Sequence, residues 1–316
     1  MKTHLIPFLS LIVLCSACKA REHASDTCSL DFSASEISME LTLGEIKFND
    51  QAMLDAIIET NKSLGINLNT PIKYVEEIRM NHTALKSAKD LQYFINLKKL
   101  ILNDAGLSCI NLSNNINLTQ LQLPNNQFVS IDLSANTELI GLNLENNRLK
   151  SIDLTNNPQI EQLILNNNQL TTIDLGNLKN LEGLNISFNR LHVLDLKNNP
   201  HITHLEGQKN EIKRIATTHL KDLKHLDFSD NKLTEIDLTN NESLSYVILA
   251  NNQINSVMLP NIYIDRIYLS NNRIVDITLP KEMGFGSLWL YENPLSEKTI
   301  GYLKEIEGVG MGNEEK

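Results

Sequence analysis

Residues 121–183 read LQLPNNQFVSIDLSANTELIG, LNLENNRLKSIDLTNNPQIEQ and LILNNNQLTTIDLGNLKNLEG, three successive segments of 21 residues that align without a gap. Their shared pattern is L-x-L-x-x-N-x-L-x-x-I-D-L, with Phe128 in place of the third leucine in the first segment. It continues in both directions, with one step of 20 residues between Val247 and Ile267. A fixed period of this length is the sequence signature of stacked repeats. The L-x-L pairs begin at Leu100, Leu121, Leu142, Leu163, Leu184, Leu205, Leu226, Val247, Ile267 and Leu288.

Each half of the repeat has its own role in the predicted structure. Successive side chains of a strand alternate between its faces, so both leucines of L-x-L point inward from a short strand. The strand is too short to stand alone and is expected to pair with the next copy in a parallel sheet. The repeated asparagine is expected to turn the chain and bond to unpaired backbone groups. The aspartate of I-D-L faces outward, to cap the turn that follows or, alternatively, to bind calcium.

This repeat is similar to that of the leucine-rich-repeat family, over residues 72–295, with Ile78 and Met80 beginning a degenerate first copy. The resemblance implies an α/β solenoid, a horseshoe with a short parallel β-sheet on its concave face. Both ends of a solenoid expose core and need covers, so we expect a helical cap at each end. The segment IKFNDQAMLDAIIE, residues 46–59, resembles the N-terminal cap of internalin-like bacterial surface proteins.

The two caps are expected at residues 45–71 and 296–316. In the first, Asn49 or Asp50 is expected to begin a helix that ends near Asn61. In the second, Ser296 is expected to cap a helix that presents Ile300, Leu303 and Ile306 to the last coil. Residues 307–316 are predicted to be frayed.

The N-terminus has the pattern of an export signal. Lys2 precedes a ten-residue apolar stretch, residues 5–14, which suits a signal peptide and is too short to span a membrane. The following C-S-A-C resembles a bacterial lipobox, although Cys15 stands where that family usually has leucine. The resemblance implies that residues 1–17 are removed, that Cys18 receives the lipids, and that residues 18–44 form a tether. We therefore expect an exported protein that is lipid-anchored to the bacterial cell envelope, at the outer membrane or cell surface; ordinary secretion is the alternative.

Two further cysteines follow Cys18, at Cys28 and Cys109. An exported pair permits a disulfide, and the alternative is two free thiols. Cys109 occupies a repeat position that holds serine at 130 and 151. A bond would therefore join the leader to the first repeats.

Charge and motifs exclude several classes of function. The formal net charge is −10 and no basic run is present, so nucleic acid is not an expected partner. No G-x-S-x-G, P-loop or H-E-x-x-H motif occurs. The sequence therefore predicts neither an enzyme nor a cofactor.

The strand residues around each leucine pair are predicted to form three columns on the concave face. The N-terminal half of these columns is rich in amides and small residues, whereas the C-terminal half holds the only tryptophan of the chain. Exposed Tyr, Trp and Arg together are typical of an interface hot spot, and stacking aromatic rings also suit sugars. Alternatively, these residues pack under the C-terminal cap or fill the strand face. The predicted partner-binding residues are His225, Tyr246, Arg266, Tyr268, Trp289 and Tyr291.

A second cluster lies beside them. His204 and Glu206 share one strand, and His225 and Asp227 occupy the same two columns one coil later. Adjacent strands lie about 4.8 Å apart, so two imidazoles and two carboxylates are expected to converge. These groups suit Zn²⁺. The alternatives are a mixed polar face in which each histidine pairs with a carboxylate, and a patch whose binding depends on pH.

Together these features predict non-catalytic recognition of a protein, or of a glycan, by the concave face of a monomeric, membrane-anchored lipoprotein. Resemblance to the internalin-like proteins extends this to adhesion or host contact. The alternatives are a structural or scaffolding protein of the cell envelope and an enzyme inhibitor.

Overall fold

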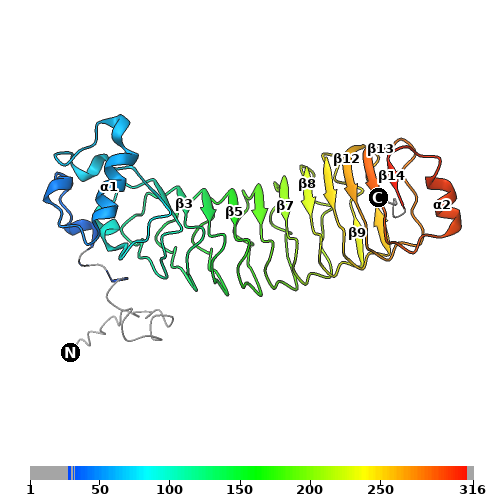
Figure 1. Cartoon of the computed structure of the whole chain (residues 1–316), viewed down its shortest axis with the longest axis horizontal. Helices are drawn as coiled ribbons and strands as arrows, with labels where there is room; N and C mark the ends of the chain where they lie inside the picture. The colour runs from blue at the N-terminus through cyan, green and yellow to red at the C-terminus, as the bar shows by residue number, and fades with distance from the viewer. Residues whose placement is uncertain (1–27, 30, 32, 312–316) are drawn as a thin grey trace, which may run out of the picture.

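The computed structural model describes residues 28–29, 31 and 33–311. They form an extended solenoid whose strands lie along one long edge (Figure 1). Twelve strands make a single parallel sheet in the order β1-β2-β3-β4-β5-β6-β7-β8-β10-β12-β13-β14, and β9 pairs with β11 on the opposite edge. The predicted leucine-rich-repeat solenoid is thus confirmed.

Most of the strands are three residues long, because each coil contributes only the first leucine of its L-x-L pair and the residue on either side of it. The two α-helices lie near the two ends of the chain, and short 3-10 turns are concentrated near the N-terminus. The strands are β1 Glu77–Asn81, β2 Lys99–Asn103, β3 Gln120–Gln122, β4 Gly141–Asn143, β5 Gln162–Ile164, β6 Gly183–Asn185, β7 His204–Glu206, β8 His225–Asp227, β9 Glu235–Asp237, β10 Tyr246–Ile248, β11 Ser256–Met258, β12 Tyr263–Tyr268, β13 Gly284–Trp289 and β14 Val309–Gly310. The helices are α1 Gln51–Thr60 and α2 Glu297–Leu303, and the 3-10 turns are η2 Ala34–Glu36, η3 Leu43–Glu45, η4 Lys62–Leu64, η5 Ile72–Tyr74 and η6 Lys89–Tyr93.

The repeat period sets the register of the sheet. Leu121 pairs with Leu100 on one side and with Leu142 on the other, and the pairing continues in step to Leu288 of β13. The 20-residue step is absorbed without a slip, since Val247 of β10 still pairs with Ile267 of β12. Equivalent residues of successive coils therefore stack in columns.

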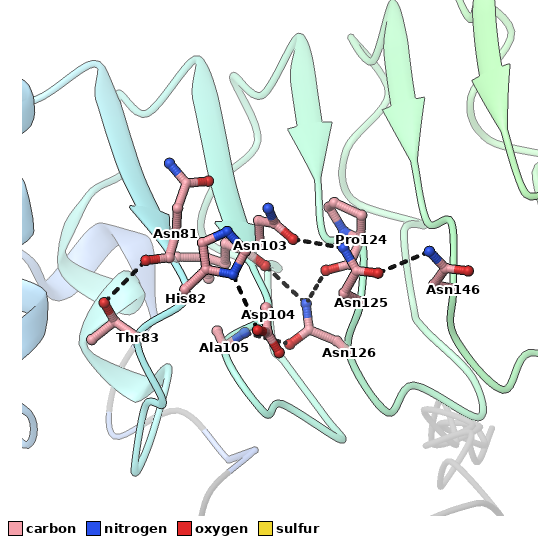
Figure 2. A network of polar contacts seen from close by, with 11 residues as sticks. Asn81, His82, Thr83, Asn103, Asp104, Ala105, Pro124, Asn125, Asn126 and Asn146 are labelled. Carbon is pink, nitrogen blue, oxygen red and sulfur yellow. Dashed lines mark hydrogen bonds and ion pairs between the residues drawn. The ribbon is translucent and has the colours of Figure 1, made fainter.

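The repeated asparagine bonds the backbone across coils, as predicted. Asn126 shows the arrangement: its Nδ2 donates to the carbonyls of Leu102 at 2.8 Å and Leu123 at 3.1 Å. It also donates to the carbonyl of Pro124 at 3.1 Å (Figure 2). Its Oδ1 accepts from the amide of Ala105 at 3.2 Å (Figure 2) and from that of Leu107 at 3.0 Å. Because Asn126 is 7 % exposed, these bonds satisfy backbone groups that water cannot reach.

The repeated aspartates cap turns. The Oδ1 atoms of Asp132, Asp153 and Asp195 each accept from the amide two residues later, at 3.0 Å. Asp174 does the same at 2.8 Å. The carboxylates are thus used within their own coils, in agreement with the capping role and not with a calcium stack.

One coil of the core departs from the leucine pattern. Gly207 occupies a position that holds leucine at 165 and isoleucine at 186. A Cβ on Gly207 would lie 2.6 Å from Cζ of Phe228, which comes from the same position of the next coil. Phe228 is fully buried. Its ring therefore fills the space that the missing side chain leaves.

At the N-terminal end, α1 lies beside β1 (Figure 1). The helix begins after Asp50, whose side chain accepts from the amide of Ala52, and it buries Met53 and Ile57. At the end of the helix, the side chains of Thr60 and Asn61 reach the outer edge of β1. Thr60 Oγ1 donates to the carbonyl of Arg79 and accepts from its amide, and Asn61 Nδ2 donates to the carbonyl of Glu77 at 2.8 Å. Some of the backbone N–H and C=O groups at this edge of the sheet are therefore hydrogen-bonded.

The predicted tether is packed over part of its length. Leu43 is fully buried, Ile37 is nearly so, and the amide of Leu43 donates to the carbonyl of Thr70. Lys89 Nζ lies 2.6 Å from a carboxylate oxygen of Asp31. Residues 37–44 therefore belong to the folded N-terminal region, because their apolar side chains are buried in it.

Cys28 and Cys109 form a disulfide, with their Cα atoms 6.1 Å apart. The bond joins the beginning of the described chain to the coil that follows β2. The predicted signal peptide, residues 1–17, and the predicted lipid acceptor Cys18 lie outside the described residues.

At the other end, α2 begins after Ser296, whose hydroxyl accepts from the amide of Thr299 at 3.2 Å. Leu303 is buried, as the sequence predicts. The chain then continues the sheet instead of fraying at 307, since Val309 of β14 pairs with Leu288 of β13. The amide of Leu290 also donates to the carbonyl of Gly310 at 2.7 Å.

We expect acid to loosen α2 because one carboxylate contributes two hydrogen bonds to its attachment. Asp276 Oδ1 accepts from Ser296 Oγ at 2.5 Å and from Thr299 Oγ1 at 2.8 Å. These two hydroxyl donors, Ser296 first, hold the pKa of the Asp276 carboxyl below its ordinary value. Because the pKa of this carboxyl is lower in the folded than in the unfolded state, its ionised form stabilises the folded state. This stabilisation is complete above the unfolded pKa of about 3.9 and is lost as the pH falls through the folded pKa.

Hydrogen exchange of residues 297–303 measures this effect. We expect their protection, relative to that of β10–β12, to drop between pH 5 and pH 2.5 (roughly one unit either side of the unfolded value). In Asp276→Asn this pH dependence should disappear. Equal protection at both pH values in the parent would show that the carboxylate does not hold the helix.

Candidate partner-binding face

The predicted concave columns are present. In the first column His204 of β7 pairs with His225 of β8, which pairs with Tyr246 of β10, which pairs with Arg266 of β12. In the second column Ile248, Tyr268 and Trp289 pair in the same way. The strand register alone brings these side chains together from four or five coils.

The first column forms a continuous line of ring contacts. The His204 and His225 ring centroids are 6.3 Å apart, and those of His225 and Tyr246 are 5.8 Å apart. Arg266 Cζ lies 5.7 Å from the centroid of Tyr246, within the range of a cation–π contact. Tyr246 is 37 % exposed. Its ring is thus held on both sides while part of it remains open to solvent.

The second group is centred on Trp289. Tyr268 and Trp289 stack with their centroids 4.3 Å apart, and Tyr291 lies 6.2 Å from Trp289 at a tilt. Trp289 remains 43 % exposed. Tyr291 is half-covered, since its hydroxyl lies where a Cβ of Gly310 would be. We call His225, Tyr246, Arg266, Tyr268, Trp289 and Tyr291 the aromatic face.

The structure places these residues differently from one another, and their role in binding stays a prediction. Tyr291 packs against β14, as the alternative from the sequence predicts, whereas Tyr246 and Trp289 present large, rigid surfaces to solvent. Ordered aromatic rings lose little conformational entropy when a partner covers them, which is why Tyr and Trp dominate interface hot spots.

The structure does not form the predicted zinc site. Glu206 Oε2 accepts from Asn185 Nδ2 at 2.7 Å. Asp227 is 9 % exposed and its Oδ1 accepts from the amide and hydroxyl of Ser229. Sharing two columns is thus insufficient, because each carboxylate turns toward a neighbour of its own. Among the described residues, no group of three or more His, Cys, Asp and Glu side chains is arranged to hold a metal ion.

Phe188 and Lys209 are not among the residues that the repeat pattern singles out, but the structure brings them together. They occupy a turn position that holds asparagine at 125, 146 and 167. Lys209 Nζ lies 4.7 Å from the centroid of the Phe188 ring. The sequence does contain an indication of them, because two consecutive repeats have neither asparagine nor aspartate at this asparagine-rich position.

Two surface depressions, of about 410 and 420 Å³, lie against β11 on the edge opposite the main sheet. Met258 contributes to both. Neither is lined by residues of the aromatic face. In the part of the chain that the structure describes, no helix is long and apolar enough to span a bilayer.

No protein-family model and no curated protein matches the chain, but solved structures do. A leucine-rich-repeat protein of Leptospira interrogans is similar with a TM-score of 0.50 and 22 % sequence identity, over 69 % of this chain and 73 % of that one. An internalin of Listeria monocytogenes, InlF, is similar with a TM-score of 0.56 and 17 % identity, over 87 % of this chain and 98 % of that one. A chain of the Drosophila Toll–Spatzle complex gives 0.57 and 18 %, over 71 % of this chain and 36 % of that one.

These likenesses and the strand register define the fold as a parallel leucine-rich-repeat solenoid. At such identities they define the fold alone. The function must therefore be argued from this chain's own residues.

Proposed function

We propose that this protein is an exported recognition protein, without catalytic activity, that binds a protein partner through its aromatic face. The observation that carries the proposal is the exposed, pre-ordered group of Tyr246 and Trp289, each held by a ring or cation contact. Such anchors, desolvated by a partner, supply most of the affinity of many interfaces.

The proposal includes the location of the protein. The signal-like N-terminus and Cys18 indicate an anchor of lipid on the bacterial cell envelope. The disulfide between Cys28 and Cys109 supports an oxidising compartment, since such bonds are rare in the cytosol. Display at the cell surface would permit adhesion or host contact, and protease treatment of intact cells distinguishes it from a role on the inner side of the envelope.

Affinity capture tests the recognition role. The bait is residues 19–316 without lipid, applied to cell-envelope and host-cell lysates, beside the triple variant Tyr246→Ala, Tyr268→Ala, Trp289→Ala. Each hot-spot truncation costs about 2 kcal/mol or more, so the triple variant should bind its partner at least about 100-fold more weakly. Circular dichroism checks that the variant is folded.

A matched control comes from the amide-rich half of the same columns. The variant Gln120→Ala, Gln122→Ala, Asn143→Ala removes three concave side chains without touching the aromatic face. It should hold the partner as the parent does. A partner held equally by the parent and the aromatic variant would move the site elsewhere on the surface and contradict the proposal.

A glycan is the second candidate ligand, favoured by the open face of Trp289, since aromatic rings stack against sugars. Binding to a glycan array that disappears in the aromatic variant, with no captured protein, would identify this class. If the protein binds neither a protein partner nor a glycan, the alternative of a structural protein of the cell envelope is favoured.

A further inference from the structure

One turn position in every coil has left-handed backbone. The column contains eleven such residues, with φ between 52° and 59°. Asn and Asp tolerate this conformation better than other non-glycine residues, and they fill most of the column. We call it the rim column: His82, Asp104, Asn125, Asn146, Asn167, Phe188, Lys209, Asp230, Asn251, Asn271 and Glu292.

Hydrogen bonds link the short polar side chains of this column. Asn146 Nδ2 donates to Asn125 Oδ1 at 2.8 Å, and Asn125 Nδ2 donates to Asn103 Oδ1, in the preceding coil, at 2.8 Å (Figure 2). Beyond the middle of the solenoid, Asn271 donates to Asn251 at 2.8 Å and Asn251 to Asp230 at 3.0 Å. Asn167, Phe188 and Lys209 lie between these two runs, and the side chains of Phe188 and Lys209 carry no amide that could continue them.

Phe188 is the most unfavourable residue of the column for its backbone. Its φ is 55°, a conformation that is an outlier for a bulky side chain. The ring is nevertheless 39 % exposed, so burial in the core does not account for it. Backbone strain held at an exposed side chain is a feature of binding sites.

Two of the seven buried polar side-chain atoms without a partner among the described residues occur just before the rim column, in successive coils. Ser187, next to Phe188, is 1 % exposed, and Asn166 occupies the equivalent position one coil earlier with 9 % exposed. Ser187 Oγ and Asn166 Oδ1 make no hydrogen bond to any described residue. Native proteins keep few such atoms, and each carries a free-energy cost.

Lys209 supplies a cation with no carboxylate partner among the described residues. Its ammonium lies over the Phe188 ring at 4.7 Å and not against Asp230, the next residue of the column, which accepts instead from Asn251. A cation beside an exposed ring complements an acidic group next to an apolar one.

We propose that Phe188 and Lys209 form a second binding site, on the rim of the concave face, for an acidic peptide segment of a protein partner. A carboxylate of the segment pairs with Lys209 Nζ, and a neighbouring apolar side chain covers the Phe188 ring. This site is separate from the aromatic face and does not depend on it.

A displayed library of random 12-residue peptides tests the proposal. Peptides are selected on the parent protein and depleted on the variant Phe188→Asn, which restores the asparagine of the rim column. We expect surviving peptides with Asp or Glu next to a large apolar residue. Synthetic copies should bind Lys209→Asn and Phe188→Asn at least tenfold more weakly than the parent, but should bind the charge-matched variant Lys221→Asn equally well.

Stability separates binding from a structural role. Phe188→Asn should raise the urea midpoint or leave it unchanged, because asparagine relieves the strained φ. A lower midpoint would show that the ring is a packing residue. No peptide surviving depletion, or survivors without a carboxylate, would overturn the proposal whatever the result for the aromatic face.

Discussion

Truncating Phe228 to alanine is expected to lower the free energy of unfolding by about 3 to 5 kcal/mol, the cost of emptying a buried phenylalanine site. The effect should lie at the high end because the ring fills the space of two coils, its own and that of Gly207. Neighbouring backbone is held by the parallel ladder and cannot collapse into the cavity. Urea unfolding followed by circular dichroism measures the change.

A substitution at Gly207 tests the same packing from the other side. Gly207→Leu restores the leucine of the repeat but places it against the Phe228 ring, and such overpacking costs about 1 to 3 kcal/mol. Combining it with Phe228→Leu rebuilds the regular column. The double variant should therefore be more stable than the sum of the effects of Gly207→Leu and Phe228→Leu predicts. Strictly additive effects would show that the two positions do not share one space.

Loss of the disulfide is expected to lower the free energy of unfolding by about as much as Phe228→Ala does. The bond closes a loop between positions 81 residues apart, and the chain entropy it removes from the unfolded state corresponds to about 4 to 5 kcal/mol. Cys109→Ser is a well-matched variant, because serine fills the same repeat position at 130 and 151. It should lower the urea midpoint of the N-terminal coils most, which hydrogen exchange of β1–β3 resolves.

Reduction provides the control for that variant. The parent treated with a thiol reductant should unfold like Cys109→Ser, and the variant itself should not respond to the reductant. An unchanged midpoint in both would mean that the bond adds nothing to the stability of the solenoid.

The repeat allowed most of the fold to be predicted, because one period determines the register of every strand. Leu121 fixes the place of Leu142, and hence of the concave residues on either side of each. The same repeat period predicts that Tyr246 lies beside Arg266 in one column. Asp50 and Ser296 as helix N-caps were also predictable, since capping depends on local sequence.

Features that depend on where a side chain turns were not predictable in this way. The zinc prediction placed Glu206 and Asp227 in the correct columns but could not foresee that Asn185 and Ser229 would bond them. The Gly207–Phe228 exchange is a relation between two copies, invisible when each is compared with the consensus. β14 was missed because two residues carry too little pattern to indicate a strand.

The central claim is that a partner covers the aromatic face, and Trp289 offers a direct probe of it. It is the only tryptophan in the chain, so protein labelled with 5-fluorotryptophan gives a single ¹⁹F resonance from that face. On addition of the captured partner, the resonance should shift and lose its sensitivity to a soluble paramagnetic quencher. A complex that forms while this resonance keeps both its position and its accessibility would contradict the assignment of the binding site to the aromatic face.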